Sequence, residues 1–339
     1  MIEQKDSKAL NTPPDILVAE NLWKSYGSRR ALQGLSFSLQ AGRVLGFLGP
    51  NGAGKTTSIR ILTTIMEPES GHFVIDGIGS EHPNEIRHRI GVLPENLGFP
   101  RQMTGIEYLT YFGQLYGRST TEARDYGLKL LEDVGLQQRG KSLIGSYSHG
   151  MRQRIGIARA LVNQPVVVFL DEPTLGLDPR GQQELLELIK RIAREQNAGI
   201  VLCSHLLSEV EGVCDDVVIL NLGQIVAKGT VADVIDQVQK NVLLDSALRL
   251  QVLPHHVSKA QEVLRAIPWI LSVEPINETE GWLRVKVAKP DNSEMSNPYQ
   301  INNKVLSALI RVKIPILRFE IEGGKLQDVF LQLTEDTVK

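Results

Sequence analysis

The spacing of hydrophobic positions switches between a strand-like and a helix-like period along most of this chain. Short apolar or alternating runs, typical of β-strands, occur at 35–39, 43–49, 71–77, 165–170 and 199–204. Segments with the apolar spacing of a helix lie among them, at 55–66 and 180–196, and a short helix then precedes a hairpin pattern at 215–230. Strands separated by helices favour an α/β fold with a mostly parallel sheet.

Residues 102–163 interrupt this alternation. Their segments TGIEYLTYFGQLYG and TEARDYGLKLLEDVG have helical patterns and few strand signals. We therefore expect a helical insertion at about 102–163, inside an α/β domain that spans 16–240.

The pattern changes again near residue 240. Strand-like and helical runs follow in the order β-α-β-β-α-β, at 247–253, 258–267, 270–276, 281–288, 302–310 and 316–322. This is the order of the split βαβ, ferredoxin-like arrangement. The sequence thus predicts an accessory C-terminal α+β domain over 241–339, which ends in a helix at 326–334.

The composition fits a two-domain globular protein. The chain has 339 residues, 42% of them hydrophobic, and a net charge of −2 that gives no global attraction to nucleic acid. Residues 1–15 are polar and lack the apolar core of a signal peptide, and no run reaches the ~18–20 apolar residues of a membrane span. Two cysteines, Cys203 and Cys214, make no disulfide framework, and a reduced, cytoplasmic setting is expected.

A phosphate-binding loop is the first candidate site. The stretch GPNGAGKT at 49–56 fits the pattern G-x-x-x-x-G-K-S/T, follows an apolar strand and opens a helix. Its backbone N–H groups and the helix N-terminus favour an anion, Lys55 is placed to reach the β- and γ-phosphates, and Thr56 can offer its hydroxyl to Mg²⁺. The alternative to a phosphate-binding loop is a glycine-rich strand–helix turn. The expected nucleotide contacts are Gly49, Pro50, Asn51, Gly52, Ala53, Gly54, Lys55, Thr56 and Thr57.

Two adjacent acids end the apolar run VVVFLDEPT at 166–174. Carboxylates in such a place are costly unless a cation pairs with them. We expect Asp171 to hold Mg²⁺, through water, and Glu172 to act as the general base for the attacking water. The alternative is a strand that ends in a solvated acidic turn.

The segment YSHGM at 147–151 resembles the signature motif of ATP-binding cassette (ABC) ATPases. It precedes the acidic strand and opens a helix, so the Ser148 hydroxyl and the Gly150 N–H make a second anion site. The resemblance implies a P-loop ABC ATPase fold with a mostly parallel sheet, an antiparallel β subdomain and a helical insertion. It also implies that this second site touches the γ-phosphate of ATP held by a second copy of the chain.

Further residues match the family in order along the chain. Tyr26 stands where an aromatic ring stacks on adenine, Asp178 matches the loop that links two composite sites, and His205 matches the histidine that contacts the γ-phosphate and orients water. Taken alone, Tyr26 is more often a packing aromatic and His205 a capping or core histidine.

Three positions depart from the usual family pattern. Glu95 replaces a glutamine that senses Mg²⁺ and attacking water and contacts the membrane subunit, and a glutamate can still ligate Mg²⁺. His149 stands where glycine is usual, and Met151 where glutamine is usual. These variants are similar to those of bacterial ABC export ATPases of the multidrug, antibiotic-resistance, sodium-export and gliding-associated group.

The resemblance implies the ATP-hydrolysing subunit of an ABC transporter, with export favoured over import. Its partners are separately encoded integral membrane permease subunits that hold it on the cytoplasmic face of the inner membrane. One alternative is a non-transport ABC ATPase acting on DNA or ribosomes, although the long coiled coils or paired cassettes of such proteins are absent from the sequence. Another is a P-loop kinase, which has no need of Ser148, Gly150 or His205. The C-terminal domain is either a dimerisation or stabilising module or a regulatory one.

Overall fold

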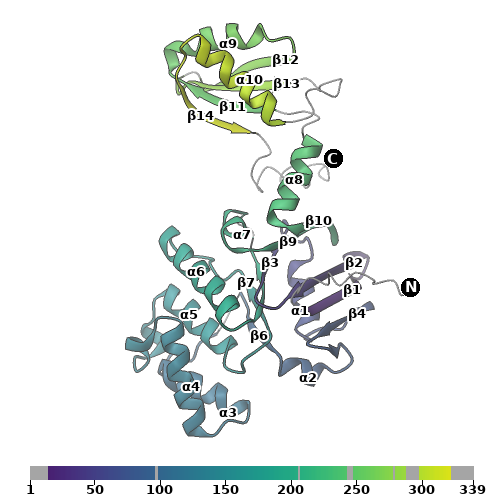
Figure 1. Cartoon of the computed structure of the whole chain (residues 1–339). Coiled ribbons are helices and arrows are strands. Elements are labelled where there is room, and N and C mark those ends of the chain that lie inside the picture. The colour runs from purple at the N-terminus through teal and green to yellow at the C-terminus, as the bar shows by residue number, and fades with distance from the viewer. Residues whose placement is uncertain are drawn as a thin grey trace, which may run out of the picture. The chain divides into compact units, whose positions relative to one another are not determined.

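The computed structural model describes residues 14–95, 98–204, 207–242, 247–277, 279–287 and 298–321. The chain forms two compact units that divide between Val231 and Ala232 (Figure 1). Each unit has a hydrophobic core of its own.

A six-stranded sheet forms the centre of the first unit, in the order β10-β9-β3-β8-β7-β6. Neighbours from β9 to β6 run parallel, and β10 pairs antiparallel with β9 as the predicted hairpin. Strands β3 and β8 are buried along their whole length, which explains their uninterrupted apolar sequences. The mostly parallel sheet is thus confirmed. Its strands are β3 (Val44–Leu48), β6 (Ile90–Leu93), β7 (Val167–Asp171), β8 (Gly199–Cys203), β9 (Asp216–Asn221) and β10 (Gln224–Thr230).

A second, antiparallel sheet of four strands lies beside it, in the order β2-β1-β4-β5. Helix α1 (Lys55–Leu62) contributes Ile59, Ile61 and Leu62 to the core cluster that both sheets share. The helix was expected to reach residue 66 but ends at Leu62, because Thr63 caps it and Thr64 takes a left-handed φ of 60°. The strands are β1 (Asp15–Tyr26), β2 (Arg29–Gln40), β4 (Ser70–Ile75) and β5 (Ile78–Gly79).

Helices make up the segment between β6 and β7. Serine or threonine N-caps start them, with full capping boxes at Thr104–Glu107 and Ser119–Glu122. Figure 1 shows α5 and α6 on the side of the six-stranded sheet away from α1. The helices of the first unit besides α1 are α2 (Pro83–Arg87), α3 (Gly105–Leu115), α4 (Thr120–Asp133), α5 (His149–Ala160), α6 (Pro179–Glu195) and α7 (Leu207–Val213).

The second unit has the predicted ferredoxin-like topology. Its four strands are all antiparallel to their neighbours, in the order β12-β13-β11-β14, and its two helices pack with them around one core. A helix that the pattern did not predict, α8 (Val231–Val242), precedes these elements. The helix expected at 326–334 lies outside the described residues. The elements are β11 (Ala247–Val252), α9 (Val257–Arg265), β12 (Ile270–Asn277), β13 (Trp282–Val287), α10 (Pro298–Arg311) and β14 (Ile316–Ile321).

Among the described residues, no helix is both long enough and apolar enough to span a membrane. In the described part of the chain Cys203 and Cys214 form no disulfide and are buried, and burial raises the pKa of the Cys203 thiol well above its usual range. The Cys203 thiol therefore stays protonated inside β8, as expected of a structural cysteine.

Candidate functional site

The loop 49–54 joins the buried strand β3 to the start of helix α1. Gly54 is the N-cap of α1 with φ 111°, and a Cβ there would lie 2.7 Å from the carbonyl oxygen of Ala31. No other residue type fits this backbone without strain. Ala53, Gly54 and Lys55 are buried, whereas Asn51, Gly52 and Thr56 are exposed. The loop thus has the form that its sequence predicted.

Lys55 extends back over this loop. Its side chain is only 8% exposed, and its ammonium donates to the carbonyl oxygens of Gly49 and, at 3.4 Å, Pro50. An ammonium has three donors, so Lys55 keeps a donor for a phosphate oxygen while it holds both carbonyls. The mouth of the loop is therefore cationic.

Asp171 and Glu172 lie at the carboxyl end of β7, between β6 and β8. The ladder pairs Leu93 with Leu170 and Asp171 with Cys203. Glu172 takes a left-handed φ of 50°, which turns it away from the course of the strand, and its N–H donates to the Cys203 carbonyl oxygen at 3.0 Å. The two adjacent carboxylates thus lie in different surroundings.

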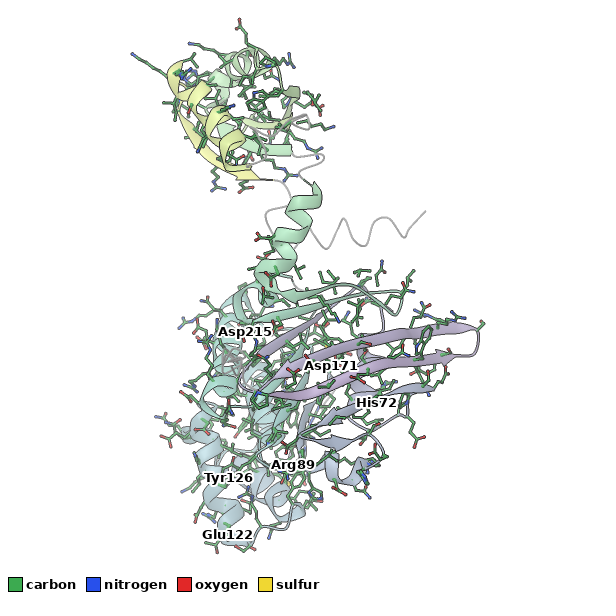
Figure 2. The ribbon with its side chains drawn as sticks, turned by 45° about the vertical axis from the view of Figure 1, so that its right-hand side comes forward. His72, Arg89, Glu122, Tyr126, Asp171 and Asp215 are labelled. Carbon is green, nitrogen blue, oxygen red and sulfur yellow. The ribbon has the colours of Figure 1, made fainter. Side chains whose placement is uncertain are left out.

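The pKa of Asp171 shows which groups converge here. Burial, and after it the negative charges of Glu172 and Glu95, raise this pKa from 3.8 to about 6, against the opposing positive charges of Lys55 and Arg60. Glu95 takes part because it follows β6, the strand beside β7. Figure 2 shows Asp171 in the interior of the unit, far from Glu122 at the outer end of the helical segment. Three segments remote in sequence, α1, the end of β6 and the end of β7, therefore meet at one carboxylate.

The signature segment begins helix α5. Ser148 is the N-cap of this helix, and its Oγ accepts from the Met151 N–H at 3.3 Å. Ser148 is exposed and Gly150 is half-buried, so hydroxyl and backbone N–H are open to an incoming anion. Asp178 is the N-cap of α6 and is also exposed. Ser148 belongs to a helix on the opposite side of the sheet from α1, so this second anion site is separate from the loop at 49–56.

Tyr26 ends β1 at the rim of the loop. Its ring is 46% exposed, and its hydroxyl donates to the sulfur of Met66 at 3.2 Å. The partner of Tyr26 in the ladder is Arg29, whose guanidinium donates to the Gly52 carbonyl oxygen at 3.2 Å. An exposed ring and a cation therefore lie beside the phosphate loop. Sequence reasoning missed Arg29 and Arg60, because their proximity to the site comes from pairing and packing rather than from a motif.

The geometry gives no role to two further residues that the sequence predicted. His205 lies outside the described residues. Thr57 is half-buried on the first turn of α1 and has no role there that the geometry singles out.

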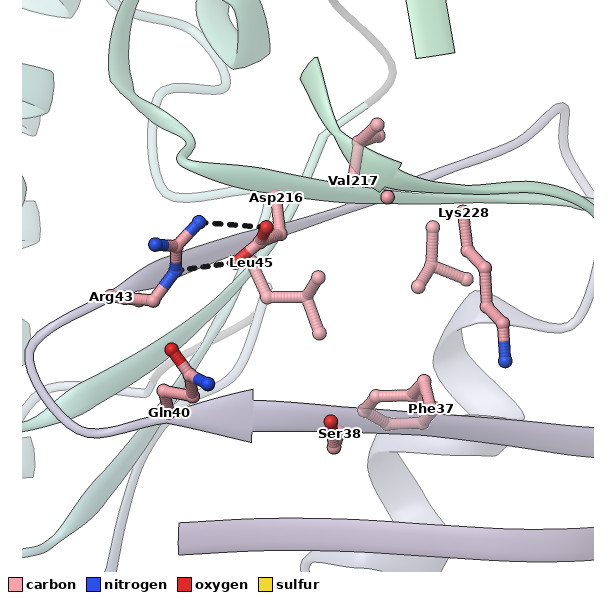
Figure 3. A pocket seen from close by; sticks show the side chains of 10 residues that line it. Phe37, Ser38, Gln40, Arg43, Leu45, Asp216, Val217 and Lys228 are labelled. Atoms are coloured by element: carbon pink, nitrogen blue, oxygen red, sulfur yellow. Dashed lines mark hydrogen bonds and ion pairs between the residues drawn. The ribbon is translucent and has the colours of Figure 1, made fainter. Parts of the chain in front are cut away.

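A hollow of about 450 Å³ lies elsewhere in the first unit, between β2, β3 and the β9–β10 hairpin (Figure 3). Its Arg43 forms a bidentate ion pair with Asp216 at 2.6 and 2.8 Å, and the Lys228 ammonium donates to the Ser36 carbonyl oxygen at 3.0 Å. Because both cations have partners and no predicted site residue lines the hollow, the candidate chemistry belongs to the loop at 49–56 and to Asp171.

Two known proteins are similar to nearly the whole chain, and a family model and a solved structure match part of it. The family model described as ABC transporter matches residues 32–175. The chain is 30% identical to the linearmycin resistance ATP-binding protein LnrL of Bacillus subtilis over 96% of this chain and 100% of that protein. It is 31% identical to the daunorubicin/doxorubicin resistance ATP-binding protein DrrA of Streptomyces peucetius over 96% and 94% of the two chains. A solved structure described as the ATP binding subunit of an ABC transporter is 32% identical, with a TM-score of 0.59, and covers 66% of this chain and 93% of its own.

Proposed function

Because this chain belongs to the ATP-binding proteins of ABC transporters, we propose that two copies close on two ATP molecules and hydrolyse them to drive export through separate membrane subunits. The chain itself is an ATPase subunit, which binds ATP and couples its hydrolysis to transport. The family resemblance carried by GPNGAGKT, VVVFLDEPT and YSHGM is thereby confirmed. The roles of individual residues, the export direction and the membrane partners are our proposal.

The charged groups that lie around Asp171 are the observation that most directly supports a site for ATP hydrolysis. Three carboxylates at one place are unstable without cations, and Lys55 and Arg60 supply only part of the compensation, since the pKa of Asp171 still stands near 6. A site with surplus negative charge facing a phosphate loop suits a metal-bound nucleotide. This is the arrangement expected of a P-loop ATPase.

The donors present also fit Mg²⁺. No group of three or more His, Cys, Asp or Glu side chains among the described residues can hold a metal ion alone. Mg²⁺ commonly takes one or two carboxylates and completes its shell with water and phosphate oxygens. Asp171 and the Thr56 hydroxyl, with Glu95 on the same side, are such a partial set, and bound Mg²⁺ supplies positive charge to the phosphates.

Residues of the chain itself then have separate roles in binding ATP and in hydrolysing it. Lys55 holds the β- and γ-phosphates and stabilises the charge that develops on the transferred group. Glu172, turned out of the strand, accepts the proton of the attacking water, a step worth ~10²–10⁴-fold in rate. His205 orients that water, as the family resemblance implies. Tyr26 stacks on the adenine ring, and the N–H groups of 49–54 hold the phosphates.

The second copy completes each site. Ser148 and Gly150 at the start of α5 donate to the γ-phosphate bound by the partner's loop, and the exposed Asp178 links the two sites. An N-cap serine suits this role because its oxygen caps its own helix while its proton remains free to donate. ATP is thus held between two chains.

The membrane partner binds near Glu95 and the helical segment. Glu95 is exposed, and Tyr111 and Leu115 on α3 are 50% and 61% exposed, which gives the helical segment a partly apolar surface. Export follows from the relatives, both of which are named as drug or antibiotic resistance proteins. We expect the chain to act on the cytoplasmic face of the inner membrane, held there by permease subunits.

Replacement of the general base tests the hydrolytic assignment. We expect Glu172→Gln to bind ATP, to lose ~10²–10⁴-fold in turnover and to accumulate as an ATP-bound dimer. Turnover is measured as phosphate release, and the dimer by size-exclusion chromatography with light scattering. Near-normal turnover by this variant would overturn the assignment.

Blocking the signature site tests the shared ATP site separately. We expect Ser148→Arg to bind ATP as a monomer, because its own phosphate loop is intact, and to form no ATP-dependent dimer in the Glu172→Gln background. Ala at position 148 is the milder control, which removes the hydroxyl without adding bulk. Retained dimerisation by Ser148→Arg would contradict the two-chain site.

A further inference from the structure

The start of α5 is hydrogen-bonded to the loop that follows Glu172. His149 is the first residue of α5, and its Nε2 lies 2.7 Å from the carbonyl oxygen of Leu175. A carbonyl oxygen only accepts, so the proton of this hydrogen bond is on Nε2, and it stays there whether the ring is neutral or doubly protonated. The contact joins two segments that are 26 residues apart in sequence.

The loop on the other side of this contact is short and has few internal constraints. The Leu175 N–H donates to the Glu172 carbonyl oxygen at 3.2 Å, and the Leu177 N–H donates to that of Thr174 at 3.1 Å. Pro173 and Thr174 are buried and anchor the first part of the loop, while Leu175 is 44% exposed. The loop is thus two successive turns, and the carbonyl that His149 holds lies between them.

Gly176 allows the left-handed turn of the backbone that lies against the imidazole. It has a φ of 77°, and a Cβ at this position would lie 3.4 Å from the Nε2 of His149. Gly150, next to His149 on the helix, lies opposite Leu177, with 3.6 Å from a Cβ at 150 to the Leu177 side chain. The first turn of α5 therefore packs along 175–177, and His149 makes a polar contact between the two segments.

We propose that His149 is a positioning residue that makes the signature segment and the loop 172–178 move as one body. This inference rests on the two-chain ATP site proposed above. In that site Ser148 touches the partner's nucleotide while Glu172 acts on the chain's own nucleotide, and His149 joins the two through Leu175. Closure of the signature on one ATP then sets the position of the general base at the other.

The hydrogen bond from His149 to Leu175 requires a side chain of a certain length with a donor near its end. Glutamine places an amide nitrogen at nearly the reach of Nε2 and can donate to the Leu175 carbonyl, whereas asparagine is one bond shorter and alanine has no donor. His149→Gln, His149→Asn and His149→Ala in the full chain therefore separate the hydrogen bond from the mere presence of a polar side chain. His72→Ala, an exposed histidine on β4 beside Glu20, is the control for the loss of a surface imidazole.

Two measurements are made on each variant. Amide hydrogen exchange over residues 172–178 of the nucleotide-free monomer reports the contact itself, and steady-state ATPase kinetics report its effect on kcat. We expect faster exchange and a three- to tenfold lower kcat for His149→Ala and His149→Asn, a change that matches one exposed hydrogen bond. Mg-ATP affinity of the monomer should be unchanged, and His149→Gln and His72→Ala should resemble the wild type.

The outcomes distinguish this inference from the function on which it rests. If the wild type forms no ATP-dependent dimer, the two-chain site fails, and the exchange data alone still decide whether His149 orders the loop. If dimerisation is intact but His149→Ala exchanges and turns over like the wild type, the positioning role is overturned. Impairment of His149→Gln equal to that of His149→Ala would also overturn it, because the donor would then not matter.

Discussion

At the scale of single residues, Asp171 carries the strongest electrostatic perturbation of the described site. Its pKa is raised to about 6 by burial and by the charges of Glu172 and Glu95. Between about pH 4 and pH 6 the folded chain therefore keeps a proton that the unfolded chain has already released. Proton binding then favours the folded state, so the free energy of unfolding falls as the pH rises through this window.

Asp171→Asn removes this titration while it keeps the shape of the side chain. Without nucleotide or Mg²⁺, we expect the variant to be more stable than the wild type above pH 6, by roughly 1–2 kcal/mol after allowance for solvent screening, and equal to it near pH 4. Urea unfolding across pH 4–8 measures the difference. Asp125→Asn, an exposed acid on α4, is the control. A constant difference at all pH values would refute the assigned cause.

Gly54 tests how strictly the phosphate loop depends on its backbone. Alanine at this position suffers both the left-handed φ of 111° and a Cβ 2.7 Å from the Ala31 carbonyl oxygen, whereas Gly77, with φ 76°, has open space around it. We expect Gly77→Ala to cost about 1 kcal/mol of stability and Gly54→Ala at least about twice that, with loss of ATP binding. Equal costs in urea unfolding would show that the close contact relaxes freely.

At the scale of elements, the turn of the β9–β10 hairpin supports the phosphate loop. The Gly223 N–H donates to the Ala53 carbonyl oxygen at 3.0 Å, and Gln33 on β2 donates to the carbonyl oxygens of Leu222 and Gly223, each at 2.8 Å. The phosphate loop and β2 thus both hold this turn in place. Leu222 at its corner is 57% exposed and has a φ of 48°, a conformation that a leucine adopts only at a cost.

Leu222→Asn should therefore stabilise the first unit by about 0.5–1 kcal/mol, since asparagine takes the left-handed region readily and little apolar surface is lost. The same substitution at Leu128, an exposed leucine inside α4, should destabilise by about 0.5 kcal/mol because asparagine is a poorer helix former. Thermal and urea unfolding of the two variants compare these signs. Destabilisation by both would show that the turn is not strained.

The sequence predicted the elements whose signals are local. The phosphate loop, the strand before Asp171 and the ferredoxin-like order could be recognised because glycine conformation, burial and periodicity act over a few residues. Helix α8 was not predicted, because it begins directly after β10 and no clear break in the sequence pattern separates the two elements. The contact of His149 with Leu175 and the position of Arg29 beside Gly52 could not be predicted, because both depend on how separate elements pack.

At the scale of the whole molecule, two separate cores imply two separable folding units. The core of the first unit draws on residues from Leu17 to Leu220, and that of the second on residues from Leu248 to Ile314. Among the described residues, none belongs to both cores, and α8 at 231–242 lies between the two cores in sequence. A chain that ends at residue 242 keeps the first core complete. We expect it to unfold in a single transition, measured by calorimetry, and to bind Mg-ATP like the full chain.

The function of the C-terminal domain decides how dimerisation responds to this truncation. If residues 243–339 stabilise the dimer, truncation in the Glu172→Gln background raises the concentration needed for ATP-dependent dimerisation, and the otherwise wild-type truncated chain turns over more slowly at low protein concentration. A domain that restrains closure predicts the reverse, because its removal frees the first units to meet. Light scattering and ATPase assays over a range of protein concentrations separate the two. Faster turnover after truncation, persisting at high dilution, would replace the stabilising role by a regulatory one.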